Sequence, residues 1–265
     1  MPRPACGSIG PVSEAETPLP GGRVGGAVRV GDTVRRPTGP WTPAVHALLA
    51  ELRGAGLDAI PEVRGVDEQG REVLGLIPGR TIGRDEPVHD ALLADGVRWL
   101  RRYHDAVAGY RPTGDVTWRH GRRALVDGEI ICHNDPAAYN WIADGDRVVG
   151  VVDWDMAGPG VALDDLAFVA WMSVPLRREL AAGDVARRLR MMAAAYGDVT
   201  PEAILAHVHV RMTMAADRIE AGQRRGDPGL LNLAAIGEPG RTRSALAALA
   251  DREPAITAAL LSRPR

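Results

Sequence analysis

The sequence predicts an α+β protein in which a small β-sheet lobe precedes a larger, mainly helical lobe. Three observations predict this fold class. The first 80 residues contain short apolar runs separated by glycine-rich turns, which are typical of strands. From residue 81 onward, apolar residues recur mostly with helical spacing. A short β-rich segment interrupts these helices at about 130–160. We therefore expect a loose leader over 1–16, an N-terminal lobe over 17–80 and a helical lobe over 81–265.

The composition is that of an ordinary globular protein. The chain has 265 residues, of which 45% are hydrophobic and 25% charged, and this length suits one two-lobed domain. The net charge of −2 argues against a nucleic-acid partner, and no apolar stretch approaches the roughly 20 residues of a membrane span. Cys6 and Cys132 lie too far apart for a paired metal motif. No signal peptide is indicated, so we expect a cytoplasmic protein without a membrane or nucleic-acid partner.

The N-terminal lobe is expected to have the element order β-β-β-α-β-β. Residues 17–37 predict two or three short strands, with a hairpin turn at Gly31-Asp32. Pro43 opens a helix that ends at Gly54 or Gly56, and its apolar stripe consists of Val45, Leu48, Leu49 and Leu52. Residues 60–79 predict two further strands around an Asp-Glu-Gln-Gly turn.

The C-terminal lobe is expected to be helical on both sides of the β-rich segment. Apolar residues at helical spacing predict one long helix over 88–110. Further helices are expected at roughly 163–173, 176–196, 201–222, 241–250 and 254–262. Glycine and proline predict breaks at 222–230 and 235–240.

The residues with the clearest chemical pattern lie in the β-rich segment. A strand at Ile130-Ile131 leads to Asp135, and Asn140 follows five residues later. Two apolar runs then flank the turn 144–146, whose Asp-Gly dipeptide is typical of a hairpin. Because the two ends of a hairpin are neighbours, Asn140 and Asp153 are expected to lie close together, one loop away from Asp135.

Such a group of oxygen ligands suits phosphoryl transfer. Catalysis of this reaction depends on positioning and on cations that balance the phosphate charge. Mg²⁺ prefers oxygen ligands, which Asn140 and Asp153 would supply. Asp135 is then free to accept the proton of a substrate hydroxyl.

These residues resemble the motifs of the aminoglycoside-phosphotransferase and choline-kinase family, which shares its fold with protein kinases. The family pattern His-Gly-Asp-x₄-Asn is matched by residues 133–140, with Asn134 at the glycine, and the Ile-Asp-Trp motif by 152–155. The resemblance implies a kinase-like fold, ATP or GTP, Mg²⁺ and a small-molecule hydroxyl acceptor. It also implies that Asp165 braces the catalytic loop. Asparagine tolerates left-handed backbone angles, so the turn at position 134 is expected to survive.

The resemblance also places a nucleotide site in the N-terminal lobe. A glycine-rich turn would cover the triphosphate, and its candidates are Gly21, Gly22, Gly25 and Gly26. The chain contains no lysine, so Arg35 would take the place of the phosphate-binding lysine, with Arg36 on the other face of its strand. The family's acidic partner should lie near Val45 or His46, and neither residue is acidic. Residues 74–78 would connect the lobes and meet the adenine edge.

Several side chains have more than one interpretation. His133 is a scaffold residue or takes part in the chemistry, and Asp155 is a metal ligand, a substrate contact or a capping residue. Trp154 and Trp171 either stack on an acceptor or pack in the core. The sequence does not identify the acceptor, although Asp217 and Glu220 are candidates for an acidic lining.

Three functions therefore remain open from the sequence. The first is an active small-molecule kinase, and the second is a catalytically weak or inactive relative that binds a ligand or partner. The third is an unrelated hydrolase that uses His133, and it is disfavoured because no Gly-x-Ser-x-Gly motif accompanies that residue.

Overall fold

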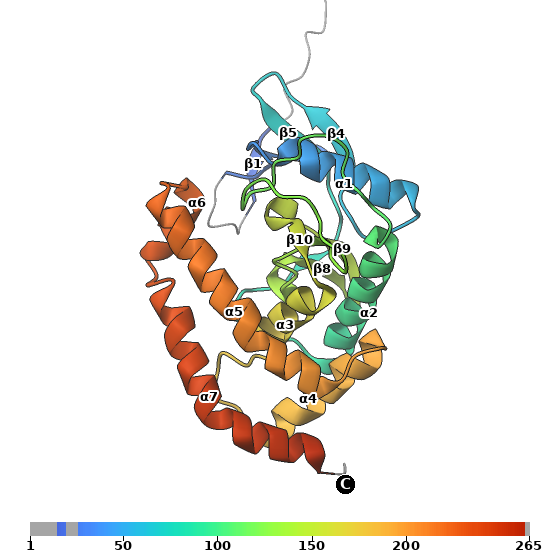
Figure 1. The fold of residues 1–265 in the computed structure, drawn as a ribbon. Coiled ribbons are helices and arrows are strands. Elements are labelled where there is room, and N and C mark those ends of the chain that lie inside the picture. The colour runs from blue at the N-terminus through green and yellow to red at the C-terminus, as the bar shows by residue number, and fades with distance from the viewer. Residues whose placement is uncertain (1–14, 20–25, 263–265) are drawn as a thin grey trace, which may run out of the picture.

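The N-terminal part of the protein is a five-stranded antiparallel sheet covered by one helix. The computed structural model describes residues 15–19 and 26–262. The strand order is β1-β2-β3-β5-β4 (Figure 1). The strands are β1 (Thr17–Pro18), β2 (Val28–Val30), β3 (Thr33–Pro37), β4 (Val63–Val66) and β5 (Arg71–Gly75). With helix α1 (Thr42–Gly54) between β3 and β4, the predicted order β-β-β-α-β-β is confirmed.

Local sequence signals explain these elements. Gly31 has a φ of 58° in the turn that joins β2 to β3, a backbone conformation that glycine adopts without strain. Helix α1 begins with Pro43 in its first turn, as the missing amide of proline allows. Its predicted stripe is buried: Val45, Leu48, Leu49 and Leu52 are all at most 2% exposed.

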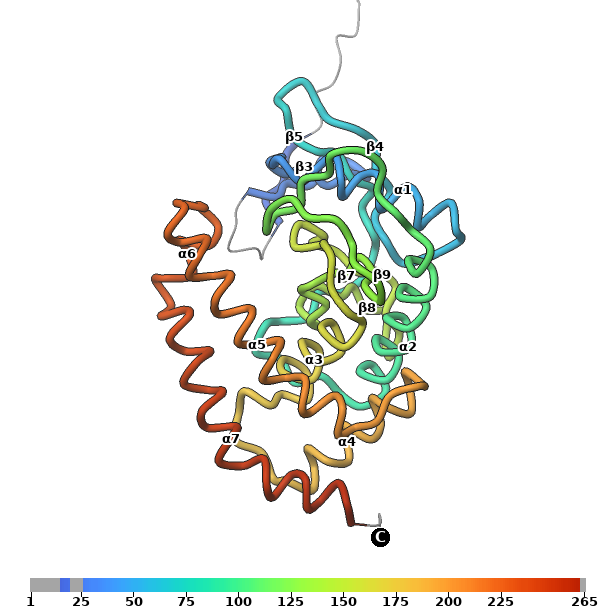
Figure 2. Tube along the Cα trace, in the orientation of Figure 1, coloured from blue at the N-terminus to red at the C-terminus, as the bar shows by residue number. Residues whose placement is uncertain are grey.

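The rest of the chain is mainly helical and extends away from the sheet (Figures 1 and 2). Its helices are α2 (Asp90–Val107), α3 (Ala162–Ser173), α4 (Ala182–Tyr196), α5 (Pro201–Arg224), α6 (Pro228–Ala234) and α7 (Gly240–Leu261). The predicted α+β class, a small sheet followed by a larger helical part, is therefore confirmed. None of the helices in the described residues is long and apolar enough to cross a membrane.

Two small sheets lie between the large sheet and the helices. Strand β7 (Ile130–Cys132) pairs with β10 (Gly158–Gly160), and the hairpin of β8 (Trp141–Asp144) and β9 (Arg147–Val151) pairs through β8 with β6 (Arg80–Thr81). Short 3-10 helices cover Ala138–Asn140 and Trp154–Met156.

Helix α2 fixes the position of this hairpin. The Asp95 carboxylate accepts a hydrogen bond of 2.8 Å from the Val148 amide. A Cβ at Gly96 would lie 2.3 Å from the Trp141 ring, so only glycine allows this close approach. Further along α2, Trp99 and Tyr103 stack with ring centroids 5.7 Å apart. The hairpin is thus built into the main core rather than attached to its surface.

The structure corrects three helix predictions. Residues 176–181 precede α4, which begins at Ala182 instead of 176. The segment 222–230, predicted as a break, contains the start of α6. The two helices predicted around Pro254 are one continuous helix α7, because its apolar residues remain buried on both sides of the proline. These residues are Leu246, Leu249, Ile256 and Leu260.

Candidate active site

The β8–β9 hairpin brings Asn140 and Asp153 together, as the spacing predicts. Trp141 is paired with Val151 in the hairpin register. One residue further out, the Val152 amide donates a hydrogen bond of 2.9 Å to the Asn140 carbonyl oxygen. Asn140 and Asp153 therefore flank the open end of the hairpin.

Asp135 lies against the same end of the hairpin. The Asn140 Nδ2 donates to the Asp135 Oδ2 at 3.2 Å and to its backbone oxygen at 2.8 Å. The Tyr139 hydroxyl donates to the Asp135 Oδ1. Burial raises the pKa of Asp135 to about 7, and the negative charge of Asp153 adds to this effect. A carboxyl with this pKa is suited to accept a proton near neutral pH.

The loop 133–140, which we call the catalytic loop, is held by Asp165 on α3. The Asp165 carboxylate accepts hydrogen bonds from the backbone amides of His133 at 2.9 Å and Asn134 at 2.8 Å. Although burial favours the neutral acid, the hydrogen bond from His104 and these amides hold the pKa of Asp165 below its usual value. Asn134 has a φ of 64°, so asparagine adopts the left-handed turn expected at this position.

Asp153 also has a left-handed backbone, with φ 62° and ψ 62°. A non-glycine residue in this conformation stores strain, which is common at ligand-binding positions. Its side chain is 41% exposed, whereas Asp155 is only 16% exposed. Asp153 is thus the carboxylate that a metal ion could reach more readily.

Arg36, not Arg35, is the basic residue that reaches these carboxylates. Its guanidinium donates to Asp153 at 3.0 Å and to Asp155 at 2.6 Å. Arg35 lies on the other face of β3, and its guanidinium is 3.4 Å from the Asp67 carboxylate. Arg35, which the resemblance places at the phosphates, therefore lies on the face of β3 away from Asp153 and Asp155.

The register of the sheet explains this reversal. Side chains alternate along a strand, so Arg36 shares its face with Val34. On the neighbouring strand β5, Arg36 faces Glu72 and Val34 faces the buried Leu74. The inward face of β3 is therefore the one that carries Arg36.

The acidic partner of Arg36 lies on β5 and not on α1, where the resemblance places it. Glu72 is 2% exposed and forms an ion pair with Arg36. The His46 Nε2 lies 2.8 Å from the other oxygen of the same carboxylate. Position 46 of α1 thus contributes a histidine that contacts the acid, instead of the acid itself. Glu72 was missed because only the β3–β5 register, and no local motif, places it opposite Arg36.

Two further side chains near Asp135 were not anticipated. Tyr139 lies within the catalytic loop and bonds to Asp135. The Arg84 guanidinium covers the Tyr139 ring at 3.7 Å from its centroid. The position of Tyr139, four residues after Asp135 in the same loop, is the signal that could have indicated it, whereas nothing local to Arg84 indicates its contact.

The remaining predicted residues divide into three groups. His133 is fully buried beside Trp154, with its Nε2 3.2 Å from the Val152 carbonyl oxygen, as a scaffold residue would be. Trp154 and Trp171 are buried in the core. Of the predicted phosphate-covering glycines, Gly26 precedes β2 with a φ of 79°. Gly21, Gly22 and Gly25 lie outside the described residues.

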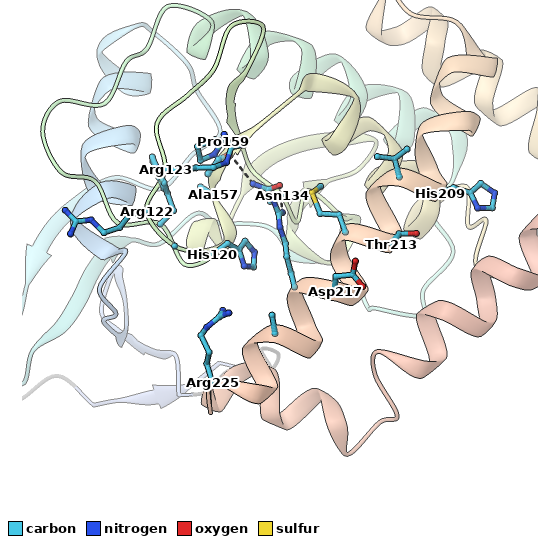
Figure 3. Close-up of a pocket in the computed structure, with 17 residues that line it drawn as sticks. His120, Arg122, Arg123, Asn134, Ala157, Pro159, His209, Thr213, Asp217 and Arg225 are labelled. Carbon is cyan, nitrogen blue, oxygen red and sulfur yellow. Dashed lines mark hydrogen bonds between the residues drawn. The ribbon is translucent and has the colours of Figure 1, made fainter.

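A cavity of about 850 Å³ opens beside the catalytic loop, where Asn134 is part of its lining (Figure 3). Asp217, one of the two acidic candidates for an acceptor site, also lines it, but its carboxylate is 3.1 Å from the Arg243 guanidinium. Glu220 pairs with the same arginine and is not part of the lining. The expected acidic lining is therefore not formed by these two residues.

Comparison with known proteins gives the family of this chain. Residues 115–201 match the model of the phosphotransferase enzyme family. The trifolitoxin immunity protein of Rhizobium leguminosarum bv. trifolii is 32% identical over 212 residues, which cover 78% of this chain and 76% of that protein.

Solved structures share the fold at low sequence identity. An amicoumacin kinase in complex with AMP-PNP and Ca²⁺ matches with a TM-score of 0.58 and 12% identity, covering 92% of this chain and 88% of the other. A choline/ethanolamine kinase family protein from Mesorhizobium loti matches with a TM-score of 0.56 and 19% identity, covering 96% and 92%. The GDP complex of an aminoglycoside 2'-phosphotransferase matches with a TM-score of 0.55 and 13% identity, covering 92% and 94%. The expected kinase-like fold is thus confirmed.

Proposed function

Because the chain belongs to the phosphotransferase enzyme family, we propose that it transfers the γ-phosphoryl group of ATP or GTP to a hydroxyl group of a small molecule. The observation that carries this proposal is the convergence of Asp135, Asn140 and Asp153 at the open end of one hairpin. Phosphoryl transfer needs a proton acceptor beside a site for Mg²⁺, and this arrangement offers both.

Asp135 is the proposed catalytic base. The acceptor hydroxyl would lie beside its carboxylate, which takes the hydroxyl proton as the oxygen bonds to the γ-phosphorus. The bond from that phosphorus to the bridging oxygen breaks, and the nucleoside diphosphate leaves with the electron pair. Tyr139 and Asn140 orient the carboxylate through their hydrogen bonds.

Asn140 and Asp153 are the proposed Mg²⁺ ligands. When bound, the ion would neutralise charge on the phosphate oxygens. The donor set fits, because Asn140 uses its Nδ2 to hold Asp135, while its Oδ1 accepts no hydrogen bond from any described residue. Among the described residues, no three or more His, Cys, Asp or Glu side chains form a metal-binding group. A site with one carboxylate, one amide and phosphate oxygens needs no such group.

Arg36 is the proposed phosphate-binding residue. Its guanidinium points to Asp153 and Asp155, and Glu72 holds its Nε. We infer that the nucleotide phosphates replace the contact with Asp153, while the buried pair with Glu72 keeps Arg36 in position. Arginine is suited to this exchange because its planar fork binds carboxylates and phosphates in the same geometry.

A catalytically weak or inactive kinase-fold protein that binds a ligand or partner is the second candidate. The ion pairs of Arg36 with Asp153 and Asp155 favour it, because they engage the carboxylates that would face a metal ion. The name of the rhizobial relative, a toxin immunity protein, fits either candidate: a toxic compound could be phosphorylated or only bound.

Nucleotide binding and turnover separate the two candidates. Thermal unfolding with ATP or GTP and Mg²⁺ is expected to show stabilisation, since a ligand of the folded state raises the melting temperature. With a broad panel of hydroxyl acceptors, turnover should fall at least about 100-fold in Asp135→Asn, the lower end of what a general base contributes. Asp144→Asn, at the exposed last residue of β8 in the same hairpin, is the matched control and should retain activity. No stabilisation by either nucleotide would contradict the kinase and favour the binding protein.

A further inference from the structure

The cavity beside the catalytic loop is bordered by four segments, one of which is 157–159 (Figure 3). The loop with His120, Arg122 and Arg123 faces helix α5, which contributes Arg218 among others, and Arg225 directly follows that helix. Asn134, which directly precedes Asp135, lies between them. A volume of about 850 Å³ is in the range of small-molecule sites. The cavity thus adjoins the loop that carries the proposed base.

The lining is strongly cationic. It contains four arginines and two histidines but only one acidic residue, Asp217, which pairs with Arg243 outside the lining. Arg122 and Arg123 are balanced by Asp115 and Glu129. The other two arginines of the lining are Arg218, on α5, and Arg225, directly after it.

Arg218 and Arg225 have no acidic partner within the described part of the chain. Arg218 is partly buried and donates only to the neutral Asn134 side chain, at 3.2 Å. No hydrogen bond or ion pair engages the Arg225 guanidinium among the residues described. Most of the other described arginines pair with a carboxylate, so these two form a local excess of positive charge.

The buried Arg211 behind the lining strengthens this excess of positive charge. Arg211 is 2% exposed, donates to the Asn134 carbonyl oxygen, and has no partner for its Nε and Nη1 within the described residues. The buried Nε2 of His120 is also without a partner there. Burial and the charge of Arg211 lower the pKa of Arg218 to about 10. Burial and the nearby arginines, Arg218 first among them, lower the pKa of His120 to about 3.

Unbalanced positive charge in a partly buried site is unfavourable until an anion enters it. We propose that this cavity is the acceptor site of the kinase proposed above, and that the acceptor carries an oxyanion, a carboxylate or a phosphate, in addition to its reactive hydroxyl. Arg218 and Arg225 bind the oxyanion, and Asn134 links this contact to the loop that holds Asp135. The inference rests on the proposed function for the hydroxyl, but the anion contact itself follows from the lining.

The same charges argue against a polycationic acceptor. An amino sugar would bring ammonium groups next to Arg218 and Arg225, with only the already paired Asp217 to receive them. Ammonium and guanidinium groups brought together in a partly buried cavity repel each other, and both lose hydration without compensation. The cavity is therefore expected to prefer an anionic acceptor over a cationic one such as an aminoglycoside.

Four sugars with one ring and different charges test the proposal by titration calorimetry. Glucuronate carries a carboxylate, glucose 6-phosphate a phosphate, glucose no charge and glucosamine an ammonium group. At least one of the two anions is expected to bind at millimolar concentration and about tenfold more tightly than glucose, since a hydrogen bond to a charged group is worth at least this factor. Glucosamine should bind no better than glucose. The two anions also distinguish a carboxylate from a phosphate ligand.

Three arginines in and directly after α5 provide the matched variants. Arg225→Gln and Arg218→Gln should each weaken anion binding about tenfold, whereas Arg224→Gln should leave it unchanged, because Arg224 is exposed, pairs with Glu220 and lies outside the cavity lining. Arg225 is exposed, so its variant is expected to fold normally even if Arg218→Gln does not. The proposal is overturned if neither anion binds, if glucosamine binds best, or if the two lining variants behave like Arg224→Gln.

The outcomes also separate this proposal from the proposed kinase function. Anion binding that depends on Arg218 and Arg225, without any phosphoryl transfer, would keep the anion site and reject the kinase. Asp135-dependent transfer to neutral or cationic acceptors, unchanged in Arg218→Gln, would keep the kinase and reject the anionic acceptor.

Discussion

The two sides of the catalytic loop differ in how their charges are balanced. On the hairpin side, Asp153 and Asp155 gather around one guanidinium, that of Arg36, which Glu72 also holds. On the cavity side, Arg218 and Arg225 meet no carboxylate among the residues described. The net charge of −2 conceals both arrangements, because each depends on which side chains the fold brings together. The hairpin side therefore holds an arginine among an excess of carboxylates, which suits a cation, whereas the cavity side has no carboxylate for its two arginines and gains stability from an anionic ligand.

Glu72→Gln tests the hairpin side and should have the largest effect on stability. It removes the buried carboxylate that pairs with Arg36 and contacts His46. We expect the free energy of unfolding to fall by about 2 kcal/mol, because the Arg36 Nε and the His46 ring lose a charged hydrogen-bond acceptor, while Arg36 keeps Asp153 and Asp155. Urea denaturation measures this change.

Glu62→Gln is the control for that change. Glu62 is half exposed and pairs with Arg64 at 3.2 Å, so its loss should cost well under 1 kcal/mol. Equal losses of unfolding free energy in the two variants would mean that the Glu72–Arg36 pair stabilises the fold no more than the exposed Glu62–Arg64 pair.

Arg36→Met and Arg35→Met form a matched pair on neighbouring positions of β3. If Arg36 binds the nucleotide phosphates, its loss should raise the KM for ATP or GTP about 10- to 100-fold, the value of one or two charge-assisted hydrogen bonds. Arg35→Met should change this KM less than about threefold, because Arg35 faces Asp67 on the other side of the sheet. Steady-state kinetics with a saturating acceptor measures both.

A gain in Mg²⁺ binding by Arg36→Met would instead favour the inactive relative. If Arg36 only neutralises Asp153 and Asp155, then Arg36→Met should strengthen the binding of Mg²⁺ alone. Calorimetric titration with MgCl₂ detects that outcome.

His120→Gln tests the cavity side and should have the smallest effect. The pKa of His120 is about 3 in the folded protein, against about 6.5 in an unfolded chain. Between these values the unfolded chain binds the extra proton, so the stability of the wild type falls as the pH decreases from about 6.5 toward 3. Between pH 7 and pH 5 we expect this residue to account for a loss of about 1 to 2 kcal/mol. Urea unfolding at both pH values should show a smaller loss in His120→Gln, and an equal loss would contradict the low pKa.

Much of the fold could be predicted because its signals are local. The apolar stripe from Val45 to Leu52 predicts helix α1, and the Gly31-Asp32 turn predicts the β2–β3 hairpin. Each signal lies within a few residues of sequence. Errors arose where tertiary contacts overrode a local signal. Pro254 predicted a helix boundary, but Ile256 and Leu260 are buried, and packing of α7 against α4 and α5 continues the helix.

The grouping of Asp135, Asn140 and Asp153 follows from local sequence alone, because a five-residue loop and a short hairpin keep these three positions close together. That Arg36 rather than Arg35 faces Asp153 depends on tertiary contacts, since the register of β3 against β5 sets which side of the strand points inward. The fold also sets the acidic partner of Arg36. This partner is Glu72, 36 residues away along the chain. The cationic cavity was beyond prediction for the same reason: Asn134, His120 and Arg218 come from three separate segments, and their electrostatics depend on distances that no local motif encodes.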